Sequence, residues 1–80
     1  MSIRFTRHAR KRMLQRKISD EMVELVLTAL DEVRMGTGEE ELVAIKQLGT
    51  REVRVIYEED ETRGLTIVFT VIAISRRQKE

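Results

Sequence analysis

The sequence predicts an α+β domain in which two N-terminal helices pack on one face of an antiparallel sheet of three or four strands. Two observations predict this class. Apolar residues recur at helical spacing between residues 6 and 30, and they alternate with polar residues from residue 41 onward. The chain has 80 residues, no linker and no internal repeat, so residues 1–80 are expected to form a single domain.

The first helix is expected within the basic stretch at residues 6–17, preceded by a short edge strand or apolar lead-in at residues 3–5. Thr6 is its expected N-cap, because a threonine hydroxyl can accept a hydrogen bond from a free amide of the first turn. A rotation of 100° per residue turns Ala9 and Met13 inward. The helix is expected to end near Arg16.

The second helix is expected to begin after Ser19 as N-cap and to stop near Leu30. Asp20 and Glu21 occupy its first turn, where the helix dipole favours acidic side chains. Its apolar stripe consists of Met22, Val23, Val26, Leu27 and Leu30.

Strands are expected at residues 32–35, 41–48, 52–58 and 65–74, separated by turns at 36–38 and 49 and by a polar loop at 59–64. In the third of these strands Val53, Val55 and Tyr57 point one way and Arg54 the other. The last strand is so rich in β-branched apolar residues that it is expected to be buried on both faces.

Composition excludes several kinds of site. The chain has no cysteine, which rules out disulfides and thiolate metal sites, and its one histidine cannot build a usual zinc site. A carboxylate site for Mg²⁺ or Ca²⁺ in the acidic runs 39–41 or 58–61 is an alternative to solvated turns, but no metal or other cofactor is expected. No secretion signal is visible, and the longest apolar run, residues 65–74, is too short to span a bilayer as a helix. We therefore expect a cytoplasmic protein without membrane contact.

The net charge of +1 hides an uneven distribution. Residues 1–17 carry seven bases and no acid, whereas residues 18–80 carry eight bases and fourteen acids. Such asymmetry favours an anionic partner that meets the basic end of the molecule. The alternative is internal, with the basic helix lying beside the acidic turns.

His8 and Arg12 are the first catalytic candidates. At i, i+4 spacing on a helix they are neighbours, with Gln15 on the same flank. The imidazole can move a proton near neutral pH, and the guanidinium can hold a non-bridging phosphate oxygen. In the alternative, His8 bonds a backbone carbonyl near the sheet and Arg12 pairs with Glu21 or Glu24.

Candidate RNA-binding residues lie on the first helix and on the sheet. The helix contributes Arg7, Lys11 and Arg16. Arg54 is expected on an open sheet surface, with Ile56 and Lys46 beside it, where it could contact an RNA backbone.

Each sheet candidate has a plainer explanation. Arg54 could instead pair across strands with Glu41 or Glu58. Thr70 is expected to share a face of the last strand with Thr66, and β-propensity alone explains both threonines. Among the three aromatic residues, only Tyr57 is a candidate for stacking on bases.

Residues 8–19, His-Ala-Arg-Lys-Arg-Met-Leu-Gln-Arg-Lys-Ile-Ser, resemble a family of small prokaryotic domains of unknown function that open with His-Ala-x-x-Arg-Met-x-x-Arg-x-Ile-Ser. In that family two helices precede strands that end in a segment similar to residues 68–72 here. The resemblance spans roughly residues 5–74. The family is distantly similar to RelE/ParE-type toxins, which implies a RelE-like fold and metal-independent RNA cleavage by a ribose 2′-hydroxyl.

The resemblance implies that His8 is the general acid or base and that Arg12 and Arg16 hold phosphate, with Arg54 and Thr70 contributing from the sheet. It also implies RNA and a cognate antitoxin as partners. One departure is that residues 75–80 contain no tyrosine or histidine. Two other interpretations stay open: a non-enzymatic module that binds nucleic acid or a partner protein, and a homodimer paired through a sheet edge.

Overall fold

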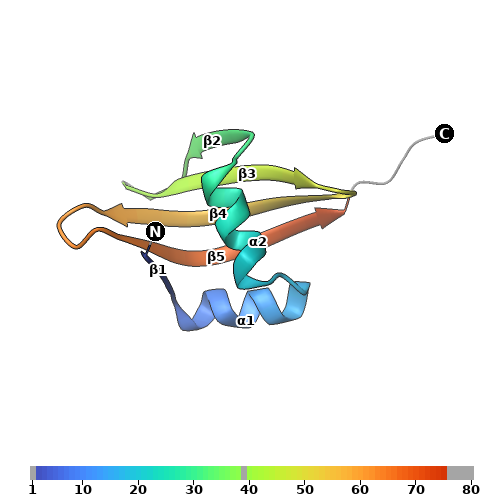
Figure 1. Cartoon of the computed structure of the whole chain (residues 1–80), viewed down its shortest axis with the longest axis horizontal. Coiled ribbons are helices and arrows are strands. Elements are labelled where there is room, and N and C mark those ends of the chain that lie inside the picture. Colours follow the sequence, from blue (N-terminus) through green and yellow to red (C-terminus); the bar gives the residue numbers. More distant parts are fainter. Residues whose placement is uncertain (1, 39, 76–80) are drawn as a thin grey trace.

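The computed structural model describes residues 2–38 and 40–75 and confirms the α+β class (Figure 1). In chain order the elements are β1 (Ser2–Phe5), α1 (Arg7–Arg16), α2 (Asp20–Thr28), β2 (Glu32–Met35), β3 (Leu42–Leu48), β4 (Arg51–Asp60) and β5 (Leu65–Ser75). Among the described residues, neither α1 nor α2 is long and apolar enough to cross a membrane.

The sheet has five strands in the order β1-β5-β4-β3-β2, and it is mixed. β1 pairs with β5 in parallel, from Ser2 opposite Leu65 to Phe5 opposite Val68, while all other neighbours are antiparallel. The expectation of three or four antiparallel strands is therefore wrong. A four-residue strand at the start of the chain gains its partner near the end, and no local pattern encodes that pairing.

Helix α1 begins and ends where the sequence predicts. The Thr6 hydroxyl accepts a hydrogen bond from the Ala9 amide at 3.1 Å and donates one to the Phe69 carbonyl at 3.0 Å. At the other end Lys17 adopts a left-handed conformation with φ 57°. The Arg51 Nη1 donates to the Arg16 carbonyl at 2.6 Å, so a strand side chain covers the carbonyl end of α1.

Helix α2 begins at its expected cap, because the Ser19 hydroxyl accepts a hydrogen bond from the Met22 amide at 3.2 Å. It ends at Thr28, two residues before the expected stop. The core fills the space between both helices and one face of the sheet. Its buried members are Ala9, Met13, Ile18, Val23, Val26, Ala44, Val53, Val55, Tyr57, Val68 and Val71.

A β-bulge in β5 changes which side chains face the helices. Ile56 pairs with Thr70 but Tyr57 pairs with Val68, so Phe69 has no residue opposite it. Thr66 faces the helices and is buried, whereas Thr70 lies on the opposite face with Ile56. The expectation that the two threonines share a face is wrong, because the extra residue inverts the alternation between them.

The expectation that the last strand is buried on both faces is also wrong. Val68 and Val71 are fully buried beneath the helices. On the other face Ile67 and Ile72 are only partly buried and Ile74 is 41% exposed. No element of the described chain covers that side, which we call the open face.

Candidate functional site

One flank of α1 brings together the residues that the helical spacing predicts. The Arg12 Nε donates to His8 Nε2 at 3.5 Å, and the Arg12 Nη1 donates to Gln15 Oε1 at 3.1 Å. His8 Nε2 is the acceptor in this contact. The alternative in which Arg12 pairs with Glu21 or Glu24 is not seen.

Most bases of α1 have no acidic partner among the residues that the structure describes. Within residues 2–38 and 40–75, Arg10 is the one α1 base that forms an ion pair, with Asp20 at 2.7 Å, and it also lies 4.1 Å from the centre of the Phe5 ring. No carboxylate of the same residues pairs with Arg7, Lys11, Arg12, Arg16 or Lys17. The first turn of α1 also has no acid. The alternative in which acidic residues of the same chain neutralise the basic helix therefore applies, within the described residues, to Arg10 alone.

Arg54 lies on the open face and already has a partner. Its Nε is 2.6 Å from Glu52 Oε2, two residues earlier on the same strand. The predicted cross-strand partners Glu41 and Glu58 do not take this place. Lys46 does not lie beside Arg54, because Lys46 pairs in register with Val53 on the helix-covered face.

A second pair on the open face has no counterpart among the sequence predictions. Arg34 Nε lies 2.5 Å from Glu32 Oε2, and this hydrogen bond is the main reason that the pKa of Arg34 lies above its usual range. Ile45 stands opposite both Glu32 and Arg54 and is only 6% exposed. A sequence pattern could have predicted both pairs. Glu-x-Arg occurs at residues 32–34 and again at residues 52–54, and on a strand that spacing puts the two charges on one face.

The predicted site is therefore divided between two faces. Ala9 and Met13 of α1 pack on one face of the sheet, whereas Arg54 and Thr70 lie on the other. Within the described residues no hydrogen bond or ion pair joins either sheet residue to the α1 flank. Within the described residues, four bases without an ion pair lie on α1: Arg7, Lys11, Arg12 and Arg16.

The acidic runs do not form a metal site in the part of the chain that the structure describes, where no three histidine or carboxylate residues could hold one ion. Residue 39 and residues 76–80, which belong to the acidic run and to the basic end of the chain, lie outside the described residues.

Tyr57 is not available for stacking on bases. It faces the helices, is 5% exposed and belongs to the core, so that expectation is wrong. Burial is the main cause that raises its pKa above the usual value, and the negative charge of Glu59 adds to it.

The raised pKa gives a prediction for alkaline pH. In the unfolded chain a tyrosine ionises near pH ~10. Because the folded-state pKa is higher, the stability that neutral Tyr57 contributes is complete below that pH and is lost as pH rises through the folded value. Tyr57 is the one tyrosine of the chain, so absorbance of tyrosinate reports it directly. We expect the pH midpoint of Tyr57 ionisation to lie above that of free tyrosine and to be lower in Glu59→Gln than in the wild type. A wild-type midpoint equal to that of free tyrosine would contradict the burial of Tyr57.

The comparisons with known proteins concern almost the whole chain. A family model described as a domain of unknown function (DUF4258) matches residues 5–73. No curated protein and no solved structure gives a significant match.

Proposed function

The chain belongs to the DUF4258 family of domains of unknown function, and we propose that it binds RNA through α1 as a toxin-type domain. The unpaired bases of α1 carry this proposal. RNA phosphates attract guanidinium and ammonium groups, and the attraction is strongest where no carboxylate competes. Arg7, Lys11, Arg12 and Arg16 offer four such groups on one ten-residue helix.

The sheet is less suited to this role. Arg54 and Arg34 each hold a glutamate at hydrogen-bonding distance, so RNA would have to displace a carboxylate to reach them. Tyr57 is buried and cannot stack on a base. Affinity would then depend mainly on phosphate contacts, which predicts weak sequence preference and strong dependence on salt.

The contact between Arg12 and His8 favours RNA cleavage as a second activity. His8 Nε2 would take the proton of a ribose 2′-hydroxyl, and the 2′ oxygen would attack the adjacent phosphorus. The bond from phosphorus to the 5′ oxygen breaks, leaving a 2′,3′-cyclic phosphate, and water protonates the departing oxygen. Arg12 would turn from His8 to the phosphate and stabilise the added negative charge.

The toxin-type assignment has two supports. The motif at residues 8–19 resembles that of domains distantly similar to RelE/ParE-type toxins, and two helices precede the main antiparallel strands, as that resemblance implies. An antitoxin would then be the natural partner, with acidic residues that cover α1. The competing function is a non-enzymatic module that uses the same helix to bind nucleic acid or an acidic protein.

The salt dependence of RNA affinity tests the proposal. We expect fluorescence anisotropy with a labelled single strand to give a logarithmic salt slope that becomes shallower by about 1.4 in Arg7→Ala/Lys11→Ala, because each lost phosphate contact removes about 0.7. Arg63→Ala is the matched control, since it removes an exposed arginine that pairs with Asp60 on the hairpin far from α1 in sequence. Equal slopes in the double variant and in the wild type would contradict a role for α1.

A further inference from the structure

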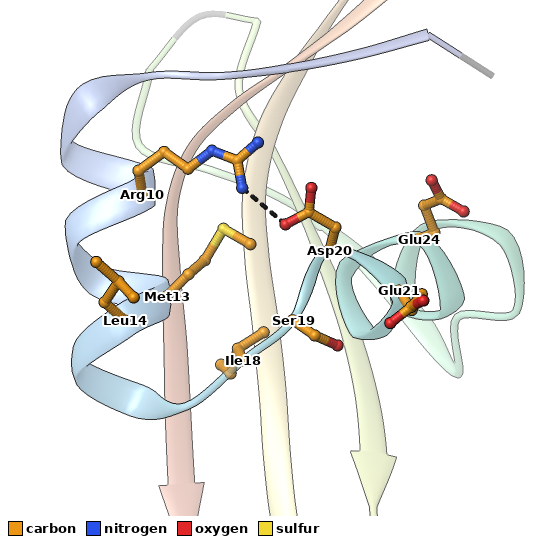
Figure 2. Close-up of a pocket in the computed structure, with 8 residues that line it drawn as sticks. All are labelled: Arg10, Met13, Leu14, Ile18, Ser19, Asp20, Glu21 and Glu24. Carbon is orange, nitrogen blue, oxygen red and sulfur yellow. Dashed lines mark hydrogen bonds and ion pairs between the residues drawn. The ribbon is translucent and has the colours of Figure 1, made fainter.

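A groove of about 660 Å³ lies between α1 and α2, on the side of α1 away from His8 and Arg12. Figure 2 shows Met13 and Ile18 pointing into the space between the helices. Met13 is 3% exposed and Ile18 is 5% exposed, and both belong to the core. Leu14 stands at the edge of this floor and is 83% exposed, the largest value among the exposed large hydrophobic side chains of the described chain. The groove therefore continues the apolar core out to the surface.

The two walls of the groove carry opposite charge. The α1 wall contains no acid over Arg7–Arg16, and the α2 wall contains no base over Asp20–Thr28. Arg10 and Asp20 join the walls at 2.7 Å. Glu21 and Glu24 line the α2 wall, and neither forms an ion pair within the described residues (Figure 2).

We propose that a second copy of this chain docks in the groove about a two-fold axis, so that α1 of each copy lies against α2 of the other. A two-fold interface brings the same patch of both copies together, so it must be complementary to itself. An apolar floor between one basic and one acidic wall meets that condition. A two-fold axis that runs along the groove places the basic α1 wall of each copy against the acidic α2 wall of the other. Each Leu14 would then enter the partner's groove and lose its contact with water.

The chemistry of the walls also argues against other occupants. A uniformly acidic segment would be repelled by Glu21 and Glu24, which line the groove. A uniformly basic one would be repelled by Arg10 in the lining, and by Lys11 and Lys17, which stand one turn before and after Leu14. The inference does not depend on RNA binding. His8 and Arg12 lie on the other flank of α1 and stay accessible in such a dimer.

Oligomeric state measured by analytical ultracentrifugation tests the proposal at about 100 μM protein, well above a micromolar Kd. We expect a dimer for the wild type and a folded monomer for Leu14→Glu, whose exposed position tolerates the change within one copy. Met35→Glu is the matched control, since Met35 is also an exposed apolar residue but lies on the edge strand β2. It should remain dimeric.

Charge reversal identifies which surfaces meet. Lys11→Glu/Lys17→Glu places two acids beside Leu14 on the α1 side while Arg10 stays basic, and Glu21→Lys/Glu24→Lys places two bases on the α2 wall while Asp20 stays acidic. In either variant like charges meet across the proposed interface at the changed positions, so each variant alone should be monomeric. An equimolar mixture should form a heterodimer, because the new acids of one variant face the new bases of the other. A monomeric wild type, a dimer that survives Leu14→Glu, dissociation by Met35→Glu alone, or a mixture that stays monomeric would each overturn the proposal.

Discussion

Replacement of Thr6 by valine is expected to lower the free energy of unfolding by about 2 kcal/mol, from one lost N-cap and one lost hydrogen bond to a partly buried carbonyl. For a domain of this size that corresponds to a fall in Tm of roughly 8–16 °C. The Thr6 hydroxyl accepts from the Ala9 amide and donates to the Phe69 carbonyl. Valine keeps the side-chain shape but can do neither, so α1 loses its cap and the bulge of β5 loses its partner.

Two variants separate these contributions. Thr6→Ser retains the hydroxyl and should stay within about 0.5 kcal/mol of the wild type. Ser19→Ala removes the α2 cap, whose hydroxyl has no second partner among the described residues, and it should cost about 1 kcal/mol. Urea unfolding followed by circular dichroism measures the free energy of unfolding of Thr6→Val, Thr6→Ser and Ser19→Ala against the wild type. If Thr6→Val cost no more than Ser19→Ala, the bond to Phe69 would add nothing to stability.

The helices and most strand limits could be predicted because their determinants are local. Thr6 and Ser19 cap the helices they precede, and both caps follow from the preference of a hydroxyl for free amides. The turn at Gly49 has the positive φ that glycine adopts most easily. Alternation from Glu52 onward put Val53 and Val55 on one side of their strand, and both are fully buried in the structure.

The remaining features depend on partners far away in the chain. The residues of β1 do not encode whether it joins β5 in parallel or antiparallel orientation. The bulge at Phe69 forms where β4 and β5 adjust their register, and it moved Thr70 to the open face. Lys46 was misplaced because its face depends on the register with Val53, which local spacing does not reveal.

The candidate site follows the same division. The contact of His8 with Arg12 comes from i, i+4 geometry within one helix, so it could be predicted. Whether Arg54 has a partner depends on which carboxylate lies nearest. That carboxylate is Glu52, two residues earlier on the same strand, and the cross-strand pairing rule that predicts Glu41 or Glu58 does not include it. Within residues 2–38 and 40–75, four bases of α1 have no carboxylate partner, and this depends on where the carboxylates of the fold lie, which only the structure provides.

RNA cleavage should fall by about 10²–10⁴-fold in His8→Ala, the range expected for loss of a general base. Arg12→Ala should lose about 10²–10³-fold, since it removes one group that stabilises the charge on phosphorus. The assay uses total RNA with EDTA present, because the proposed chemistry needs only a proton acceptor and a guanidinium. Growth arrest on expression of the wild type should disappear in the same two variants.

The design of this assay must separate cleavage from contamination and from binding. Variants purified in the same way carry the same traces of host ribonuclease, so a difference between them belongs to the protein itself. Arg63→Ala changes a base on the hairpin that pairs with Asp60, and it should cleave like the wild type. Cleavage that persists in His8→Ala would contradict the proposed base. RNA binding with a steep salt slope but no cleavage by the folded wild type would assign α1 to a binding module, because its free charge would then hold phosphate without reacting with it.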